Sequence, residues 1–205
     1  ELVRRQGLTG GVDAGINWGL GSMFDYKGPM LWMAQFFHDA TTPSEKLLAA
    51  IDGVIEGVRK DAARGKTNWR VTTTWQGQTR SRGQVEGFGM GGEQVPRRFS
   101  IDIDEPCELG GGNAFANPQE YLIAALNACM TVGYVAQCAI RGITLTQLAI
   151  ETAGEIDLRG FLGIDPTVPP GYESLRSTVR LKGDGTEAQF AEIHAAVMAT
   201  SPNVY

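Results

Sequence analysis

The longest apolar run of the chain, residues 118–141, predicts one long helix. Apolar side chains fall on every side of this helix, which is typical of a helix covered all round. Asn117 and Pro118 suit its cap and first helical position, and Gly142 suits its end. We therefore expect a central helix that other parts of the protein cover on each side.

Length alone does not separate this helix from a membrane span, which needs about 20 apolar residues. Asn127, Thr131 and Gln137 interrupt the run, and alanine is more frequent in it than leucine and phenylalanine. These features favour the central helix of a soluble core, and no membrane partner is expected.

The other patterns predict an α+β protein. Residues 44–65 have helical spacing, with Thr42 as a plausible cap, whereas residues 67–106 alternate as strands. Residues 145–205 indicate two strands and a helix that Thr186 caps. The strands come in runs, which favours an antiparallel sheet packed on the central helix. Residues 1–43 are expected to be an amino-terminal extension of unknown role.

Charge and composition exclude several function classes. The net charge is -5 and the pI about 5.1, so the surface lacks the basic stripe that nucleic acid requires. His38 and His194 are too few for a zinc site, and the chain has no dinucleotide-binding fingerprint. We expect no metal and no cofactor. The absence of a signal-peptide pattern favours a cytoplasmic location.

The three cysteines form no CxxC pair, and their odd number excludes a fully paired disulfide framework. Cys138 lies nine residues after Cys129, on the opposite helix face and about 13 Å along the axis. A disulfide needs Cα atoms within about 7 Å, so Cys138 is expected in the core. Cys107 lies in a glycine-rich loop, and the sequence does not show what it contacts.

Cys129 has two interpretations from the residues alone. A free cysteine is usually a small buried hydrophobe. The neighbours that would form its core face are Leu122, Ala125, Leu126, Val132 and Ala136. A reactive cysteine instead needs a nearby cation or a helix N-terminus that lowers its pKa. Cys129 is three turns into the helix, so a cation would have to come from elsewhere.

Several longer motifs resemble the OsmC/Ohr family of small cysteine-dependent hydroperoxide reductases. They are DEPCELGGG, ANPQEYLIAALNAC, GEIDLRGFLGID, VPPGYESLRSTVRLKGD and SPNVY, and the resemblance covers residues 44–205. It implies a homodimer in which two chains interleave their sheets around paired central helices. It also implies an active site at the subunit interface.

The resemblance assigns Cys129 to the cysteine that attacks the peroxide. It implies a polarising arginine from the strand region, for which Arg82 aligns best and Arg80 is the second choice. It also implies a glutamate after the helix-opening proline, but Gln119 follows Pro118 and Glu120 comes next. The residues themselves favour a capping box of Glu120 with Asn117 over a catalytic role. In the two-cysteine members, the resemblance implies a second cysteine, directly before a proline, that resolves the sulfenic acid as a disulfide. This chain has Ser201-Pro202 there, and Cys107 is a weak candidate for a substitute.

Two functions follow. The first is a stress-response protein whose Cys129 reduces organic hydroperoxides, or reacts with a related electrophile, and is regenerated by an external thiol reductant. The second is a binding module that holds a small apolar ligand in the dimer-interface pocket without chemistry. In both, the small residues of the central helix predict a large apolar two-fold interface.

Overall fold

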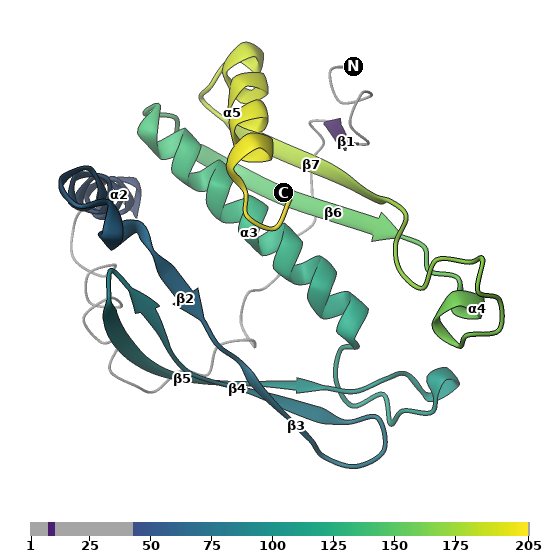
Figure 1. Cartoon of the computed structure of the whole chain (residues 1–205). Helices are drawn as coiled ribbons and strands as arrows, with labels where there is room; N and C mark the ends of the chain where they lie inside the picture. Colours follow the sequence, from purple (N-terminus) through teal and green to yellow (C-terminus); the bar gives the residue numbers. More distant parts are fainter. Residues whose placement is uncertain (1–7, 11–42, 205) are drawn as a thin grey trace. The chain divides into compact units, whose positions relative to one another are not determined.

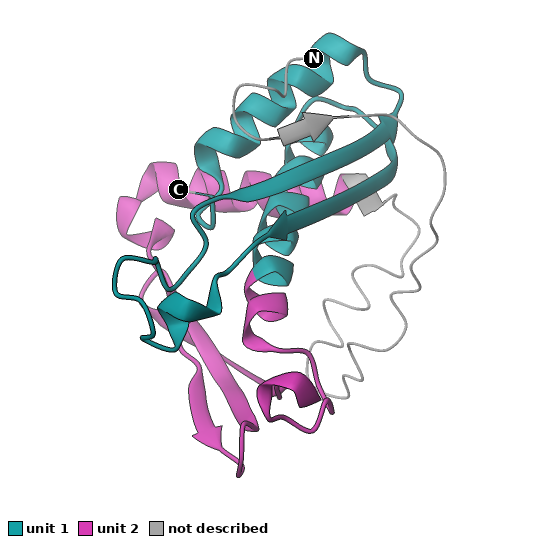
Figure 2. Ribbon diagram, turned by 90° about the vertical axis from the view of Figure 1, so that its right-hand side faces the viewer, with its two compact units in different colours: residues 1–16, 123–205 teal, residues 17–122 magenta. Residues whose placement is uncertain are grey.

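The computed structural model describes residues 8–10 and 43–204, which fall into two compact units (Figures 1 and 2). Unit 1 comprises residues 1–16 and 123–205, and unit 2 comprises residues 17–122.

Unit 1 contains a three-stranded sheet in the order β1-β7-β6. β6 (Leu145–Gly154) and β7 (Leu175–Gly183) pair antiparallel, and β1 (Leu8–Gly10) pairs parallel with β7. The helices are α3 (Pro118–Ile140), which begins in unit 2, the single turn α4 (Leu158–Phe161) and α5 (Glu187–Thr200). The first strand falls in the segment to which the sequence assigned no role.

The core of unit 1 lies between the sheet and the two long helices. Met130, Tyr134 and Cys138 of α3 are almost fully buried, as are Ile193 and Val197 of α5. Ile143 and Val179 complete the buried cluster, with Leu148, Ile150 and Leu181 of the sheet packed against it. Spacing of four residues along α3 places its three core side chains on one face.

This core face differs from the one predicted. Leu122 and Val132 are 49% and 69% exposed, and Ala125 is exposed, so only Leu126 of the expected set contacts the buried cluster. A helix apolar on all sides has no polar side to reveal which face packs inward. Among the described residues, α3 is long and apolar enough to cross a membrane by length and composition alone.

The ends of the helices confirm the caps and stops that the sequence predicts for α3 and α5. Asn117 and Glu120 form a reciprocal capping box at α3, with N–H to side-chain oxygen distances of 2.8 and 2.9 Å. Thr186 and Gln189 form the same arrangement at α5. Gly142 has a φ of +66°, the left-handed conformation that ends a helix. The predicted cap Thr42 lies outside the described residues.

Unit 2 consists of a helix and an antiparallel sheet. Its elements are α2 (Pro43–Lys60), η2 (Ala62–Gly65), β2 (Thr67–Trp69), β3 (Thr72–Trp75), β4 (Ser81–Met90), β5 (Glu93–Ile103) and η3 (Cys107–Leu109). β2 and β3 pair with successive parts of β4, and β5 pairs with β4 along its length. The helix expected over 44–65 therefore ends earlier, and Asp61 caps a separate short turn.

Asp104 organises the loop between the sheet and α3. Its side chain is fully buried, and its carboxylate oxygens accept hydrogen bonds from the Thr79 hydroxyl at 2.8 Å and from the N–H groups of Glu105, Gly112 and Ala114 at 2.9, 3.0 and 3.2 Å. Burial raises the pKa of this carboxyl, but the four hydrogen bonds favour its ionised form more strongly, and the net shift is downward.

Candidate functional site around Cys129

α3 and α5 bring the thiol of Cys129 to the hydroxyl of Ser201, 72 residues away in the sequence. The Cys129 Sγ and Ser201 Oγ atoms are 3.2 Å apart. Ser201 is 7% exposed and Cys129 is half-buried. In the described part of the chain, the Ser201 hydroxyl has no other hydrogen-bond partner. Residue 201 is the position at which the two-cysteine members of the family have their second cysteine. It contacts Cys129, the residue that the resemblance assigns to attack on the peroxide.

Close packing of the two helices makes this contact possible. Gly133 faces Val197, and a Cβ atom on Gly133 would lie 3.2 Å from a methyl of that valine. Ser201 follows the last residue of α5 in an extended conformation, and its N–H bonds to the Val197 carbonyl at 2.9 Å. A small residue at 133 thus lets the end of α5 reach α3.

The segment after α5 is also held on α3. The Asn203 side-chain amide donates to the carbonyl of Ala125 at 3.1 Å. In a regular helix that carbonyl accepts the N–H of the residue four positions later, which is Cys129. Asn203 therefore anchors the chain one turn before the thiol, with Ser201 between this anchor and the end of α5.

A network of hydrogen bonds joins the same part of α3 to β6 and β7. The Thr152 hydroxyl lies 2.6 Å from Asn127 Oδ1 and 2.7 Å from the Ser177 hydroxyl. Asn127 also donates to the Ile150 carbonyl at 3.4 Å. Because Thr152 has one hydroxyl hydrogen and donates it to Asn127, Ser177 must donate to Thr152. Asn127 in an apolar helix signals such a network, but its partners cannot be read from the sequence.

The buried Tyr134 pairs with His194, which is half-buried. The Tyr134 hydroxyl lies 2.5 Å from His194 Nδ1, and the rings stack with centroids 6.1 Å apart. Burial raises the pKa of Tyr134 and lowers the pKa of His194. His194 is therefore a core partner of α3. Within residues 8–10 and 43–204, no group of three His, Cys, Asp or Glu residues could hold a metal ion. His38 lies outside the described residues.

The other predicted site residues lie in unit 2. The Arg82 Nε atom pairs with Asp102 Oδ1 at 2.6 Å, across the β4–β5 register, and this pairing raises the pKa of Arg82. Arg80 lies at the end of the turn between β3 and β4, where its carbonyl accepts from the Gln76 N–H at 2.8 Å. Glu120 serves as the cap described above. The roles of these residues toward Cys129 stay predictions.

The remaining cysteines differ in their surroundings. Cys138 is 1% exposed and belongs to the core cluster of unit 1, as expected. Burial raises the pKa of its thiol. Cys107 is exposed in η3 of unit 2. Cys129 is thus the half-buried thiol of unit 1, and Cys138 is shielded from reagents.

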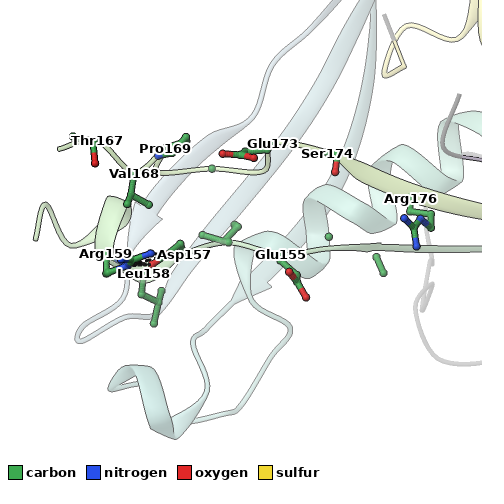
Figure 3. A pocket seen from close by; sticks show the side chains of 14 residues that line it. Glu155, Asp157, Leu158, Arg159, Thr167, Val168, Pro169, Glu173, Ser174 and Arg176 are labelled. Carbon is green, nitrogen blue, oxygen red and sulfur yellow. Dashed lines mark hydrogen bonds and ion pairs between the residues drawn. The ribbon is translucent and has the colours of Figure 1, made fainter. Parts of the chain in front are cut away.

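An open groove lies elsewhere in unit 1, between the end of β6 and the segment that leads into β7 (Figure 3). Glu155, Glu173 and Arg176 line it, together with a pair in which Arg159 Nη2 lies 2.5 Å from Asp157 Oδ2. Hydrogen bonding to Arg159 lowers the pKa of Asp157 to about 2.

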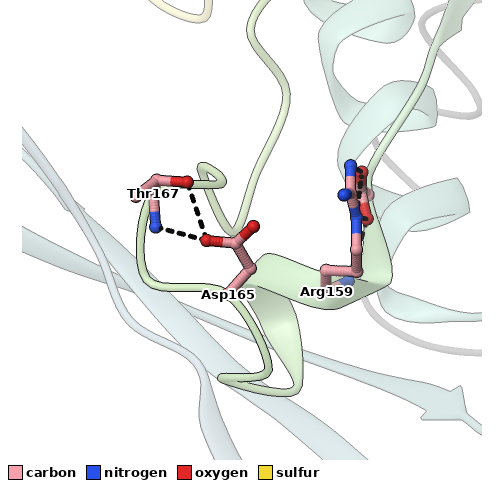
Figure 4. A network of polar contacts seen from close by, with 4 residues as sticks. Arg159, Asp165 and Thr167 are labelled. Carbon is pink, nitrogen blue, oxygen red and sulfur yellow. Dashed lines mark hydrogen bonds and ion pairs between the residues drawn. The ribbon is translucent and has the colours of Figure 1, made fainter.

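Figure 4 shows that Asp165 and Thr167 brace the adjoining loop, with two hydrogen bonds of 2.7 and 3.0 Å. Cys129 is not among the residues that line the groove. The exposed charged side chains there are unlike the apolar walls expected for the pocket of an apolar ligand.

Residues 110–204 match the model of the protein family described as OsmC-like protein. This part of the chain belongs to the OsmC-like family. The match includes α3, Cys129 and Ser201. No curated protein sequence is significantly similar to the chain.

Two solved structures show the same OsmC-like fold. An OsmC-like protein from Mycoplasma pneumoniae has a TM-score of 0.52 and 15% identity over 67% of this chain and 84% of its own. An OsmC-like protein of unknown function from Vibrio cholerae has a TM-score of 0.51 and 13% identity over 67% of this chain and 91% of its own. At these identities, the likeness is one of fold.

Proposed function

We propose that this OsmC-like protein reduces organic hydroperoxides with Cys129 and an external thiol. The observation that carries the proposal is the 3.2 Å contact between Cys129 Sγ and Ser201 Oγ. It supports the alignment of both residues with the two positions that the family uses in peroxide reduction. Because residue 201 is a serine and has no sulfur, the proposed cycle forms no internal disulfide at this position.

The cycle balances with one hydroperoxide and two thiols. The Cys129 thiolate attacks the terminal peroxide oxygen, the O–O bond breaks, and the alkoxide leaves as an alcohol after it takes a proton. Cys129 is then a sulfenic acid. An external thiol attacks its sulfur and releases water, and a second thiol reduces the mixed disulfide and regenerates Cys129.

Replacing Cys129 by serine is expected to abolish turnover, because the hydroxyl is a far weaker nucleophile than a thiolate. Steady-state consumption of an alkyl hydroperoxide with dithiothreitol measures the effect. Cys138→Ala is the matched control, since it removes a buried thiol from the same helix and should keep the activity. Equal turnover by wild type and Cys129→Ser would exclude the thiol mechanism.

A small-molecule binding module is the second candidate function. Ser201 in place of a cysteine favours it, and so does Arg82, whose guanidinium Asp102 already pairs. The same assay separates the two functions. A folded wild-type protein whose Cys129 reacts with neither hydroperoxide nor a thiol reagent at neutral pH would favour binding.

We also propose that the protein is a homodimer. Ala124, Ala128, Val132 and Val135 share the side of α3 that faces away from the core of unit 1, and all four are exposed in the single chain. In unit 2, Trp69, Val71 and Trp75 are 62%, 52% and 73% exposed. Exposed apolar faces of this kind support an interface of the obligate class, above about 2,000 Å².

Sedimentation at micromolar concentration is expected to give about twice the 22.1 kDa mass of one chain. Val132→Glu would place a charge in the proposed interface and is expected to shift the protein toward monomer. Cys129 lies about 100° around α3 from the core residue Met130, at the edge of the exposed side. A folded wild-type monomer at this concentration would contradict both the dimer and a site lined by two chains.

A further inference from the structure

Ser201 has an unusual environment for a serine that follows a helix. Its side chain is 7% exposed, so its hydroxyl is largely cut off from water. Its Oγ atom contacts Cys129 Sγ at 3.2 Å and has no other hydrogen-bond partner among residues 8–10 and 43–204. A buried hydroxyl without a partner is costly, so the sulfur satisfies the polar requirement of Ser201.

The direction of this hydrogen bond depends on the state of the sulfur. With a neutral thiol, either group can donate. A thiolate has no hydrogen and can only accept, so the Ser201 O–H must then donate to it. A hydrogen bond to a charged group is stronger than one between neutral groups. The Ser201 hydroxyl is therefore placed to donate to the sulfur in its nucleophilic, ionised form.

We infer that Ser201 is a positioning residue for Cys129, and that its hydroxyl donates to the thiolate and holds it for reaction. This inference rests on the proposed function. The anchors on either side fix the hydroxyl: the Ser201 N–H bonds to Val197 at 2.9 Å, and Asn203 bonds to Ala125 at 3.1 Å. The Ser201 hydroxyl thus assists the thiolate before it reacts. Because serine cannot form a disulfide, an external thiol must reduce the oxidised sulfur of Cys129.

The test is the pH dependence of Cys129 alkylation by iodoacetamide in the full chain, followed by mass spectrometry of the peptide that contains Cys129. Ser201→Ala is expected to slow alkylation about tenfold at pH 7, because the thiolate loses its donor. At pH 9.5 the rates should converge, because cysteine thiols in general are largely ionised at that pH. Ser201→Thr keeps the hydroxyl and should recover much of the rate at pH 7.

Thr200→Val is the matched control. It removes the neighbouring hydroxyl, which is exposed and donates to the Ala196 carbonyl at 2.8 Å, and it should leave the alkylation profile unchanged. A rate deficit in Ser201→Ala that is equal at pH 7 and pH 9.5 would reflect altered access and would overturn the inference. Unchanged alkylation in a folded Ser201→Ala protein would overturn it as well.

Hydroperoxide turnover separates this inference from the proposed function. If wild type lacks turnover but Ser201→Ala shows the pH-dependent deficit, the positioning role stands and the peroxidase proposal fails. If wild type turns over hydroperoxide and Ser201→Ala alkylates and turns over at the wild-type rate, the peroxidase proposal stands and the positioning role fails.

Discussion

Ser201→Cys is expected to form a disulfide with Cys129 when one equivalent of an alkyl hydroperoxide is added. The native Oγ and Sγ atoms are 3.2 Å apart, and a disulfide bond is about 2.05 Å long, so the two groups need to approach by only about 1 Å. Oxidation of Cys129 to the sulfenic acid supplies the electrophile, and the new thiol displaces water from it. Loss of two titratable thiols and a peptide-mapped cross-link would establish the bond.

The matched control for this variant is Thr200→Cys. Residue 200 is adjacent, but it is exposed and its hydroxyl donates to the Ala196 carbonyl on its own helix, so a thiol there should not pair with Cys129. Ser201→Cys should also gain turnover with a dithiol reductant, because an internal disulfide protects the sulfur from further oxidation. Equal cross-linking in both variants would contradict the geometry of the site.

The elements that could be predicted from the sequence are those with local end signals. Asn117 with Glu120 and Thr186 with Gln189 are short-range capping pairs, and both form as the pattern indicates. The predicted central helix, over 118–141, differs from α3 by one residue. Such boundaries depend on hydrogen bonds within a few residues, which the sequence contains in full.

The parts that could not be predicted depend on contacts between distant segments. Ser201 was noted only for the sulfur that it lacks, because its contact with Cys129 requires α5 to pack on α3 beside Gly133. The face of α3 that packs into unit 1 could not be identified from the sequence, since an apolar helix without a polar side gives no directional signal. The sequence also does not show that Arg80 lies in the turn before β4 and Arg82 on the strand, because alternation does not mark where a turn ends.

Asp104→Ala is expected to cause a large loss of stability in the loop that precedes α3. The substitution leaves the Thr79 hydroxyl and three backbone N–H groups without the acceptor that they share in a fully buried position. Each of these four hydrogen bonds to a charged acceptor is worth about 1 kcal/mol or more, so we expect the melting temperature to fall by about 10 °C. Circular dichroism during heating measures the melting temperature. Asp102→Ala is the control, because it removes a half-buried aspartate from β5, the strand that ends just before Asp104.

The pH dependence of unfolding tests whether the charge of the Asp104 carboxylate stabilises the fold. Because the folded-state pKa of Asp104 lies below its unfolded value, ionisation contributes stability above about pH 4, and this stability is lost as the pH falls through the folded-state pKa. Asp104→Asn keeps the shape but does not titrate. Its free energy of unfolding, measured with urea at pH 7 and at pH 3, should therefore fall less between the two than that of wild type. An equal fall in both proteins would show that Asp104 does not carry this dependence.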